Sequence, residues 1–177
     1  NELYAHAAEK GHAKARFHLG YNYKNGTGVA IDFNRCVELY EQSAKQGYVN
    51  AQFNLCELYR TGSLDNENGE PMTIPENDQL HFKWAFAAAK QGDVNGQAYT
   101  GECYRNGYGV EQNDESGFEW CMKAAEQDDV EAQYFIGQYY ENGFGGVDLD
   151  LTQALFWYRK AAAQGRQSAM EAVERLA

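Results

Sequence analysis

The chain has 177 residues, of which 44% are apolar and 23% charged, and it carries a formal net charge of −11 at pH 7. On average this negative charge repels phosphate backbones, so we expect no nucleic-acid binding. No apolar run approaches the roughly 18 to 20 residues of a membrane-spanning helix, so we expect no direct membrane insertion. No secretory signal segment is visible, which leaves the cytoplasm and a bacterial periplasm both open as locations.

The strongest signal is a repeating unit. A closing glycine, replaced once by aspartate, recurs at spacings of 36, 45, 36 and 37 residues, at Gly11, Gly47, Gly92, Asp128 and Gly165. Self-similarity at such a period is typical of solenoid proteins, in which each unit packs only against its neighbours.

Each unit opens with the pattern of an amphipathic helix. Its apolar stripe follows positions i, i+4 and i+8, as Ala15, Leu19 and Tyr23 do in the first unit. A small residue follows the Leu slot in every unit, at Gly20, Cys56, Gly101 and Gly137. Because glycine inside a helix costs about 1 kcal/mol relative to alanine, its recurrence predicts a neighbouring helix that approaches closely at this slot.

A second helix follows the first in each unit. In three of the four units the turn sequence Asn-Gly-x-Gly, at Gly26, Gly107 and Gly143, supplies residues that tolerate positive φ, and it ends the first helix. Good N-capping residues then open the second helix, at Asp32, Asn77, Asn113 and Asp150. Helix, turn and helix alternate with no strand-like segment, which predicts an all-α fold, a right-handed α/α superhelix or solenoid.

The pattern predicts one solenoid domain over residues 1–177. Its expected parts are the second helix of a preceding repeat at 1–14, repeats at 15–50, 51–95, 96–131 and 132–168, and a capping helix at 169–177. The first residues indicate a chain cut from a longer repeat protein. In the last helix Glu174 takes the small-residue slot, which predicts a cap with a polar outer face.

Aligned with one another, the four units give the consensus A-x-x-x-L-G-x-x-Y-x-x-G-x-G-V-x-x-D, closing on W-Y-x-K-A-A-x-Q-G. It resembles the Sel-one-like repeat (SLR) family, relatives of the tetratricopeptide repeats. Residues 132–165 match almost slot for slot, whereas Cys56, Thr100 and Asp128 depart from it. Some bacterial members carry a disulfide in each repeat. Here only the third unit holds two cysteines, Cys103 and Cys121, so we expect reduced thiols.

The resemblance implies a protein-binding scaffold without catalysis, whose first helices line a concave groove. Matching slots on those helices give the candidate partner-binding residues Lys14, Phe17, Tyr21, Lys24, Asn50, Phe53, Glu57, Arg60, Asn95, Glu102, Arg105, Tyr134, Gln138 and Glu141. Two interpretations stay open for these residues. They form either a mixed-charge surface for an extended peptide or a solvated face whose i,i+3 pairs contribute only about 0.2–0.5 kcal/mol each.

Asn50 and Asn95 occupy equivalent positions and also have two interpretations. Each amide both donates and accepts hydrogen bonds, so the two side chains could bracket a peptide backbone. Alternatively, each caps the first helix of its unit.

An insertion at Thr61–Asn77 lengthens the second unit and holds both prolines of the chain. Insertions in solenoids map to loops on one face, often at a binding edge. We expect a plain flexible loop, with partner contact through Met72 and Ile74 as the alternative. Its segment DNENGE lacks the spacing of a calcium loop, so we expect no calcium site.

The sequence contains few of the motifs that are typical of enzymes. The histidines lack zinc-ligand spacing, and no GxSxG, HExxH or P-loop occurs. Cys121 with His81 is conceivable as a nucleophile and base, but a packing cysteine is the favoured interpretation. We expect no metal, cofactor or catalytic residue.

The favoured function is therefore a monomeric, non-catalytic adaptor that binds a protein or extended peptide of basic or neutral character. Two alternatives remain. A bacterial immunity or inhibitor protein would block a toxin or hydrolase, with salt-sensitive binding. A carbohydrate-binding or envelope scaffold would stack sugars on exposed aromatic side chains such as Tyr21, Tyr134 and Tyr139.

Overall fold

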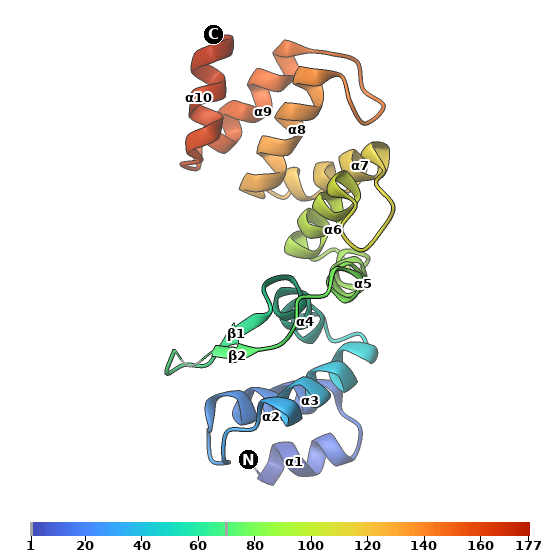
Figure 1. Ribbon diagram of the computed structural model, residues 1–177, viewed down its shortest axis with the longest axis vertical. Coiled ribbons are helices and arrows are strands. Elements are labelled where there is room, and N and C mark those ends of the chain that lie inside the picture. Colours follow the sequence, from blue (N-terminus) through green and yellow to red (C-terminus); the bar gives the residue numbers. More distant parts are fainter. Residues whose placement is uncertain (1, 70) are drawn as a thin grey trace. The chain divides into compact units, whose positions relative to one another are not determined.

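A computed structural model describes residues 2–69 and 71–177 of the chain, without the side chain of Met72. Within these residues lie ten helices and one pair of short strands (Figure 1). In chain order they are α1 (Glu2–Glu9), α2 (Ala13–Asn25), α3 (Phe33–Lys45), α4 (Val49–Thr61), β1 (Ser63–Asp65), β2 (Pro71–Thr73), α5 (Asp78–Ala89), α6 (Val94–Asn106), α7 (Asp114–Ala125), α8 (Val130–Asn142), α9 (Leu151–Ala163) and α10 (Gln167–Leu176). The predicted all-α repeat fold is confirmed.

The chain forms two compact units, Asn1–Gln91 and Gly92–Ala177. Unit 1 contains α1 to α5 and the strand pair, and unit 2 contains α6 to α10. Inside each unit, the two helices of a repeat pack against each other, as α2 does with α3 and α8 with α9.

Capping side chains explain where the helices begin. The predicted caps of the second helices are confirmed, because the side chains of Asp32, Asn77, Asn113 and Asp150 accept hydrogen bonds from the first-turn backbone. The first helices begin two residues earlier than the stripe predicted. Asp93, not Asn95, caps α6, and Asp129 caps α8. The capping role considered for Asn50 and Asn95 is therefore wrong, since both lie inside the first turn.

The small-residue slot is where the two helices of a repeat meet. A Cβ placed on Gly137 would lie 2.5 Å from the ring of Tyr158, and one on Gly20 would lie 2.9 Å from the ring of Tyr40. Both distances are too short for real atoms, so a side chain cannot be added there without moving the ring. The steric reason inferred from the sequence is confirmed.

The inserted segment differs from the prediction. Instead of a plain loop, Ser63–Asp65 and Pro71–Thr73 form an antiparallel hairpin, with Ser63 opposite Thr73 and Leu64 opposite Met72. Figure 1 shows this hairpin leaving the end of α4. The main-chain N–H of Ile74 also donates to the carbonyl of Gly62 (2.9 Å), which closes the base of the hairpin. The expectation of a chain without strands is thus corrected at this one insertion.

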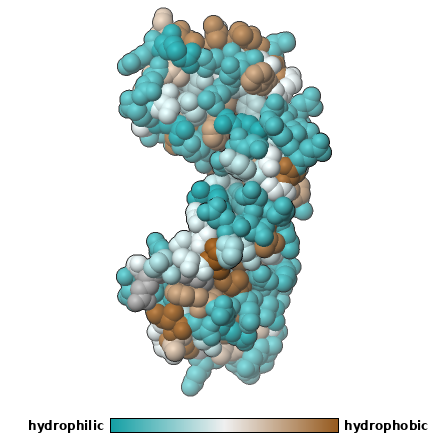
Figure 2. Space-filling view, viewed as in Figure 1, coloured by the Kyte–Doolittle hydropathy of each residue, from teal (hydrophilic) through white to brown (hydrophobic). Residues whose placement is uncertain are grey.

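The outside of the molecule is mainly polar. Hydrophilic residues cover most of the face shown in Figure 2, in keeping with a mean hydropathy of −0.69. No helix among the described residues is long and apolar enough to span a membrane. All four cysteines are buried free thiols.

Candidate protein-binding surface

All fourteen candidate groove residues lie on the first helices of the repeats, α2, α4, α6 and α8. Unit 1 carries those on α2 and α4, and unit 2 carries those on α6 and α8. Their surroundings differ from one unit to the other. Several in unit 1 contact the inserted hairpin or aromatic neighbours, whereas four of the six in unit 2 line two pockets: Asn95, Glu102, Arg105 and Gln138.

In unit 1, the tip of the hairpin lies on the C-terminal end of α2. The Tyr21 hydroxyl donates to the Glu67 carboxylate, and Lys24 Nζ donates to the Asp65 carbonyl (3.0 Å). The Glu67 main-chain N–H donates to Asn25 Oδ1 (2.9 Å). The hydrogen bond to Glu67 raises the pKa of Tyr21. Two predicted groove residues, Tyr21 and Lys24, are therefore already bound within the chain.

Other candidates in unit 1 are partly engaged as well. Phe17 stacks on Tyr40 with ring centroids 5.2 Å apart, and it also contacts Tyr48. Arg60 pairs with Glu57 on the same helix (Nη2 to Oε2, 2.9 Å), which is the i,i+3 pair expected from the sequence. Phe53 is half-buried on α4, and Lys14 and Asn50 are exposed.

In unit 2, Arg105 on α6 reaches across to α8. Its Nη1 donates to Gln138 Oε1 (2.8 Å), and its guanidinium lies 4.0 Å from the centre of the Phe135 ring. Gln138 Nε2 in turn donates to the Tyr134 hydroxyl (3.1 Å). The stacked and hydrogen-bonded guanidinium is held in one place, so its remaining N–H groups are preorganised for a ligand.

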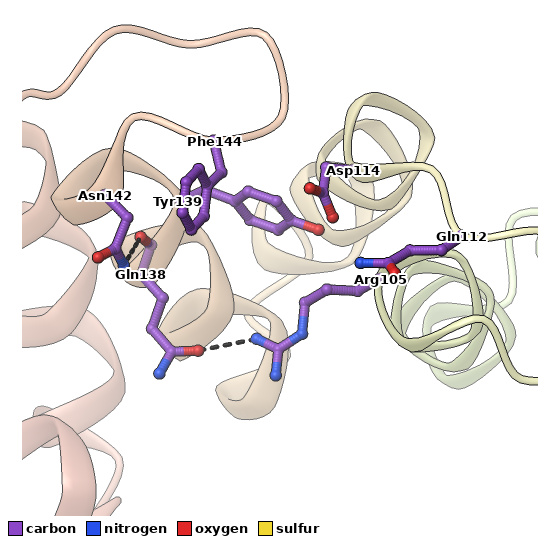
Figure 3. A pocket seen from close by; sticks show the side chains of 7 residues that line it. All are labelled: Arg105, Gln112, Asp114, Gln138, Tyr139, Asn142 and Phe144. Carbon is purple, nitrogen blue, oxygen red and sulfur yellow. Dashed lines mark hydrogen bonds between the residues drawn. The ribbon is translucent and has the colours of Figure 1, made fainter.

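A pocket of about 280 Å³ opens beside this guanidinium (Figure 3). It is called the Arg105 pocket below, and it is lined by Arg105, Gln112, Asp114, Gln138, Tyr139, Asn142 and Phe144. Arg105 and Gln138 were predicted as groove residues, and the other five were missed. Of these five, Asn142 could have been identified from the sequence. Asparagine recurs at the last position of the first helix in three repeats, at Asn25, Asn106 and Asn142.

Tyr139 contributes a buried hydroxyl to the Arg105 pocket. The side chain is only 4% exposed, so it is not the exposed sugar-stacking aromatic that the sequence suggested. Within the described residues its hydroxyl has no hydrogen-bond partner. Figure 3 shows this hydroxyl pointing toward Asp114 and the Arg105 side of the pocket. Burial raises the pKa of Tyr139 above its ordinary value, so the group is a neutral O–H donor.

A second pocket, of about 210 Å³, lies nearer the start of the same two helices. It is called the acidic pocket below, and it is lined by Asn95, Ala98, Tyr99, Glu102, Asp129, Glu131 and Phe135. Glu131 pairs with Arg166, and the Asp129 carboxylate caps α8. The Arg105–Phe135 stack stands between the two pockets, since each of its members lines one of them.

The remaining predicted residues of unit 2 are engaged inside the unit. Glu141 accepts hydrogen bonds from the Tyr158 hydroxyl (2.6 Å) and from the Arg175 guanidinium on α10. The Arg175 hydrogen bond lowers the pKa of the Glu141 carboxyl. The Tyr134 ring lies under the Arg166 guanidinium (4.3 Å) and packs against Tyr158, so neither face of this tyrosine is presented as a sugar platform.

The histidine and the cysteine considered for nucleophilic catalysis, His81 and Cys121, lie in different units. His81 Nδ1 lies 3.2 Å from the sulfur of Cys56 and 3.1 Å from its carbonyl oxygen, and Cys121 belongs to the other unit. Cys56 and His81 are both buried, and burial raises the pKa of Cys121 to about 12. A thiol with such a pKa is a poor nucleophile. Among the described residues, no group of three or more His, Cys, Asp or Glu side chains is placed to hold a metal ion.

Comparison with known families gives four consecutive matches to the Sel1 repeat, at residues 13–48, 49–93, 94–129 and 130–165. The chain belongs to the Sel1 repeat family. Sel1 repeat proteins are generally protein-interaction scaffolds without catalysis. A search of curated proteins found no match.

Solved structures agree with this assignment. Protein c5321, a protective antigen with an SLR fold present in uropathogenic Escherichia coli strains, is 32% identical over 95% of this chain, with a TM-score of 0.77. A Sel1 repeat protein from Oxalobacter formigenes is 31% identical over 97%, with a TM-score of 0.71. The chain spans 34% and 64% of their respective lengths. Immunity protein PA5088 from Pseudomonas aeruginosa shares the fold at 22% identity over 95% of this chain and 57% of its own, with a TM-score of 0.50.

Proposed function

We propose that this Sel1 repeat chain is a non-catalytic scaffold that binds a protein partner along the α6–α8 face of unit 2. The observation that supports the proposal best is the Arg105–Phe135 stack with a pocket on either side of it. Such an arrangement offers an extended polypeptide two side-chain sites and a rigid, charged surface between them.

The energetics of binding favour this face. Arg105 and Gln138 are already fixed by hydrogen bonds to each other and to their neighbours, so little side-chain entropy is lost when a ligand arrives. The acidic pocket suits a basic side chain of the partner, and the net charge of −11 steers basic partners toward the chain. We therefore expect association to slow as salt is added.

Site-specific photo-crosslinking tests the proposal. A photo-reactive phenylalanine is placed at Phe144 beside the Arg105 pocket, or at Asn95 in the acidic pocket, and the cross-linked proteins are identified by mass spectrometry. Both positions should capture the same protein. The matched control is Glu119, which is exposed on the second helix α7 of the same unit and should capture little of that protein.

The substitution Arg105→Glu should remove the cross-link from Phe144 while leaving the helical circular dichroism spectrum unchanged. Capture of the same protein from Glu119 in equal yield would overturn the proposed face. If the captured protein is a toxin or hydrolase whose activity falls on binding, the scaffold acts as an inhibitor of that protein.

A further inference from the structure

Two asparagines at the same repeat position are held in the same way. Asn25 Nδ2 donates to the carbonyl of Tyr21 (3.2 Å), and Asn142 Nδ2 donates to the carbonyl of Gln138 (2.8 Å). In each case the carbonyl belongs to the residue four positions earlier in the helix. With the nitrogen engaged by the helix backbone, the oxygen of the amide remains as an acceptor for another group.

The hairpin shows what this acceptor binds in unit 1. Asn25 Oδ1 accepts the main-chain N–H of Glu67, while the Glu67 carboxylate accepts the hydroxyl of Tyr21. Lys24 binds the carbonyl of Asp65 two residues earlier. The end of α2 thus holds a short segment by its main chain and by one acidic side chain.

The Arg105 pocket contains the same three kinds of group. Asn142 supplies the anchored amide oxygen, Arg105 the cation, and Tyr139 the phenolic hydroxyl. In unit 1 the cation and the hydroxyl both belong to α2, at Lys24 and Tyr21. In the Arg105 pocket the cation belongs to α6 and the hydroxyl to α8, at other positions of the repeat. The Tyr139 hydroxyl is buried and, within the described residues, has no partner, so the pocket holds a donor without an acceptor. A ligand that places a hydrogen-bond acceptor next to the Tyr139 hydroxyl removes the free-energy cost of this unsatisfied donor.

We propose that the Arg105 pocket binds an acidic residue in an extended segment of the partner protein. The N–H of that residue donates to Asn142 Oδ1, and its carboxylate accepts hydrogen bonds from the Arg105 guanidinium and the Tyr139 hydroxyl. The inference rests on the proposed function, since it specifies what one of the two pockets takes. Charge-assisted hydrogen bonds of this kind are about twice as strong as neutral ones, which makes the acidic side chain the main determinant of specificity.

Asp114 lines the same pocket and provides a sharp test of the ligand's charge. Its carboxylate lies in the first turn of α7, where the helix dipole favours a negative group. An incoming carboxylate is repelled by Asp114, whereas an incoming ammonium or guanidinium is attracted. Asp114→Asn should therefore tighten the binding of an acidic segment and weaken that of a basic one.

The probe is a fluorescent peptide with the hairpin-tip sequence Ser-Leu-Asp-Asn-Glu-Asn-Gly, acetylated and amidated, titrated against the native chain by fluorescence anisotropy into the millimolar range. We expect saturable binding that weakens about tenfold or more in Arg105→Gln and about three- to tenfold in Tyr139→Phe or Asn142→Ala. Arg159→Gln, at an exposed position on α9, is the matched control and should bind like the native chain. Replacing the peptide's glutamate by glutamine should weaken binding to a similar extent as Arg105→Gln.

Tyr139→Phe separates a binding role from a structural one. The substitution removes a buried hydroxyl that has no partner within the described residues, so the midpoint of thermal unfolding should stay the same or rise while peptide binding weakens. A fall in both would mean that the hydroxyl serves folding, and would overturn its role in binding.

Three other results would overturn the inference. They are no saturable binding, equal binding of the glutamate and glutamine peptides, and weaker binding by Asp114→Asn. None of these results bears on the cross-links from Phe144 and Asn95. The proposed scaffold function is therefore tested separately from the acidic-segment site.

Discussion

The ends of α2 and α8 carry the same anchored asparagine but have different neighbours. At α2, the inserted hairpin covers Tyr21, Lys24 and Asn25 with its own main chain and with Glu67. α8 ends in a short glycine turn as α2 does, but among the described residues no hairpin from a following repeat lies on it, and its surface opens into the Arg105 pocket. An insertion in one repeat can thus occupy a surface that another repeat leaves available to a partner.

The repeat that carries the insertion, formed by α4 and α5, differs from the last repeat in how its two helices fit together. In the last repeat Gly137 makes room for Tyr158, whereas the repeat with the insertion has Cys56 and Ala85 at the equivalent positions. Both pairs of residues are buried. The contact between the two helices of a repeat is therefore filled by different side chains in these two repeats.

The largest effect is expected from filling the Gly137 slot. Gly137→Val places a branched side chain where even a Cβ would lie 2.5 Å from Tyr158, and it should destabilise the chain by about 3 kcal/mol. The measurement is urea unfolding followed by tryptophan fluorescence. The double variant Gly137→Cys/Tyr158→Ala copies the pair found at Cys56 and Ala85, and it should recover part of the loss. An unchanged midpoint for Gly137→Val would contradict the packing comparison.

Removing the hairpin should make the two surfaces alike. In a chain whose residues 62–75 are replaced by the short turn of the third repeat, Tyr21, Lys24 and Asn25 lose their internal partner. Isothermal titration calorimetry with the acidic peptide should then give two binding sites in place of one. Lys24→Gln in the shortened chain is the control and should weaken the new site only. One site in a correctly folded shortened chain would show that α2 does not bind such segments by itself.

A smaller, pH-dependent effect is expected at Glu141. Its pKa is lowered in the folded chain, chiefly by the hydrogen bond from Arg175, so its contribution to stability is present above its ordinary value of 4.5. That contribution is lost as the pH falls through the lowered folded value. Glu141→Gln should therefore reduce the drop in thermal midpoint between pH 7 and pH 3, whereas Glu119→Gln, on the exposed surface of α7, should not. Equal acid sensitivity of the two variants would contradict the assignment.

The smallest effect is expected at the hairpin contact itself. Tyr21→Phe removes the hydrogen bond to Glu67, which is exposed and therefore contributes about 1 kcal/mol or less. Amide hydrogen exchange should speed up a few-fold in residues 63–73 with no change in the global midpoint. Tyr108→Phe, at an exposed tyrosine outside the hairpin, is the control. Unaltered exchange would mean that the other contacts hold the hairpin alone.

The fold could be predicted from the sequence because its determinants are local and repeated. The stripe of Ala15, Leu19 and Tyr23 and the caps at Asp32 and Asp150 recur in every unit, and each fixes one helix. The starts of the first helices were missed by two residues because Asp93 and Asp129 lie outside the apolar stripe that the pattern follows.

The candidate site was only partly predictable, since its groups come together from distant segments. The hairpin contacts join residues more than 40 positions apart, and no repeat pattern encodes them. Tyr139 was predicted to be an exposed aromatic side chain, whereas it is only 4% exposed. In the structure, room for its ring depends on Gly117 and Gly145, where a Cβ would lie 2.5 Å from its hydroxyl and 2.9 Å from its ring.

The most direct test of the central claim is a nuclear magnetic resonance titration of the isotope-labelled chain with the acidic hairpin-tip peptide. We predict that the signals of Arg105, Gln138 and the Asn142 side-chain amide shift first, while those of Tyr21 and Asn25 shift only after the hairpin has been removed. Shifts that begin at Tyr21 and Asn25 in the native chain, or on the second helices α7 and α9, would contradict the claim that the α6–α8 face is the open binding surface.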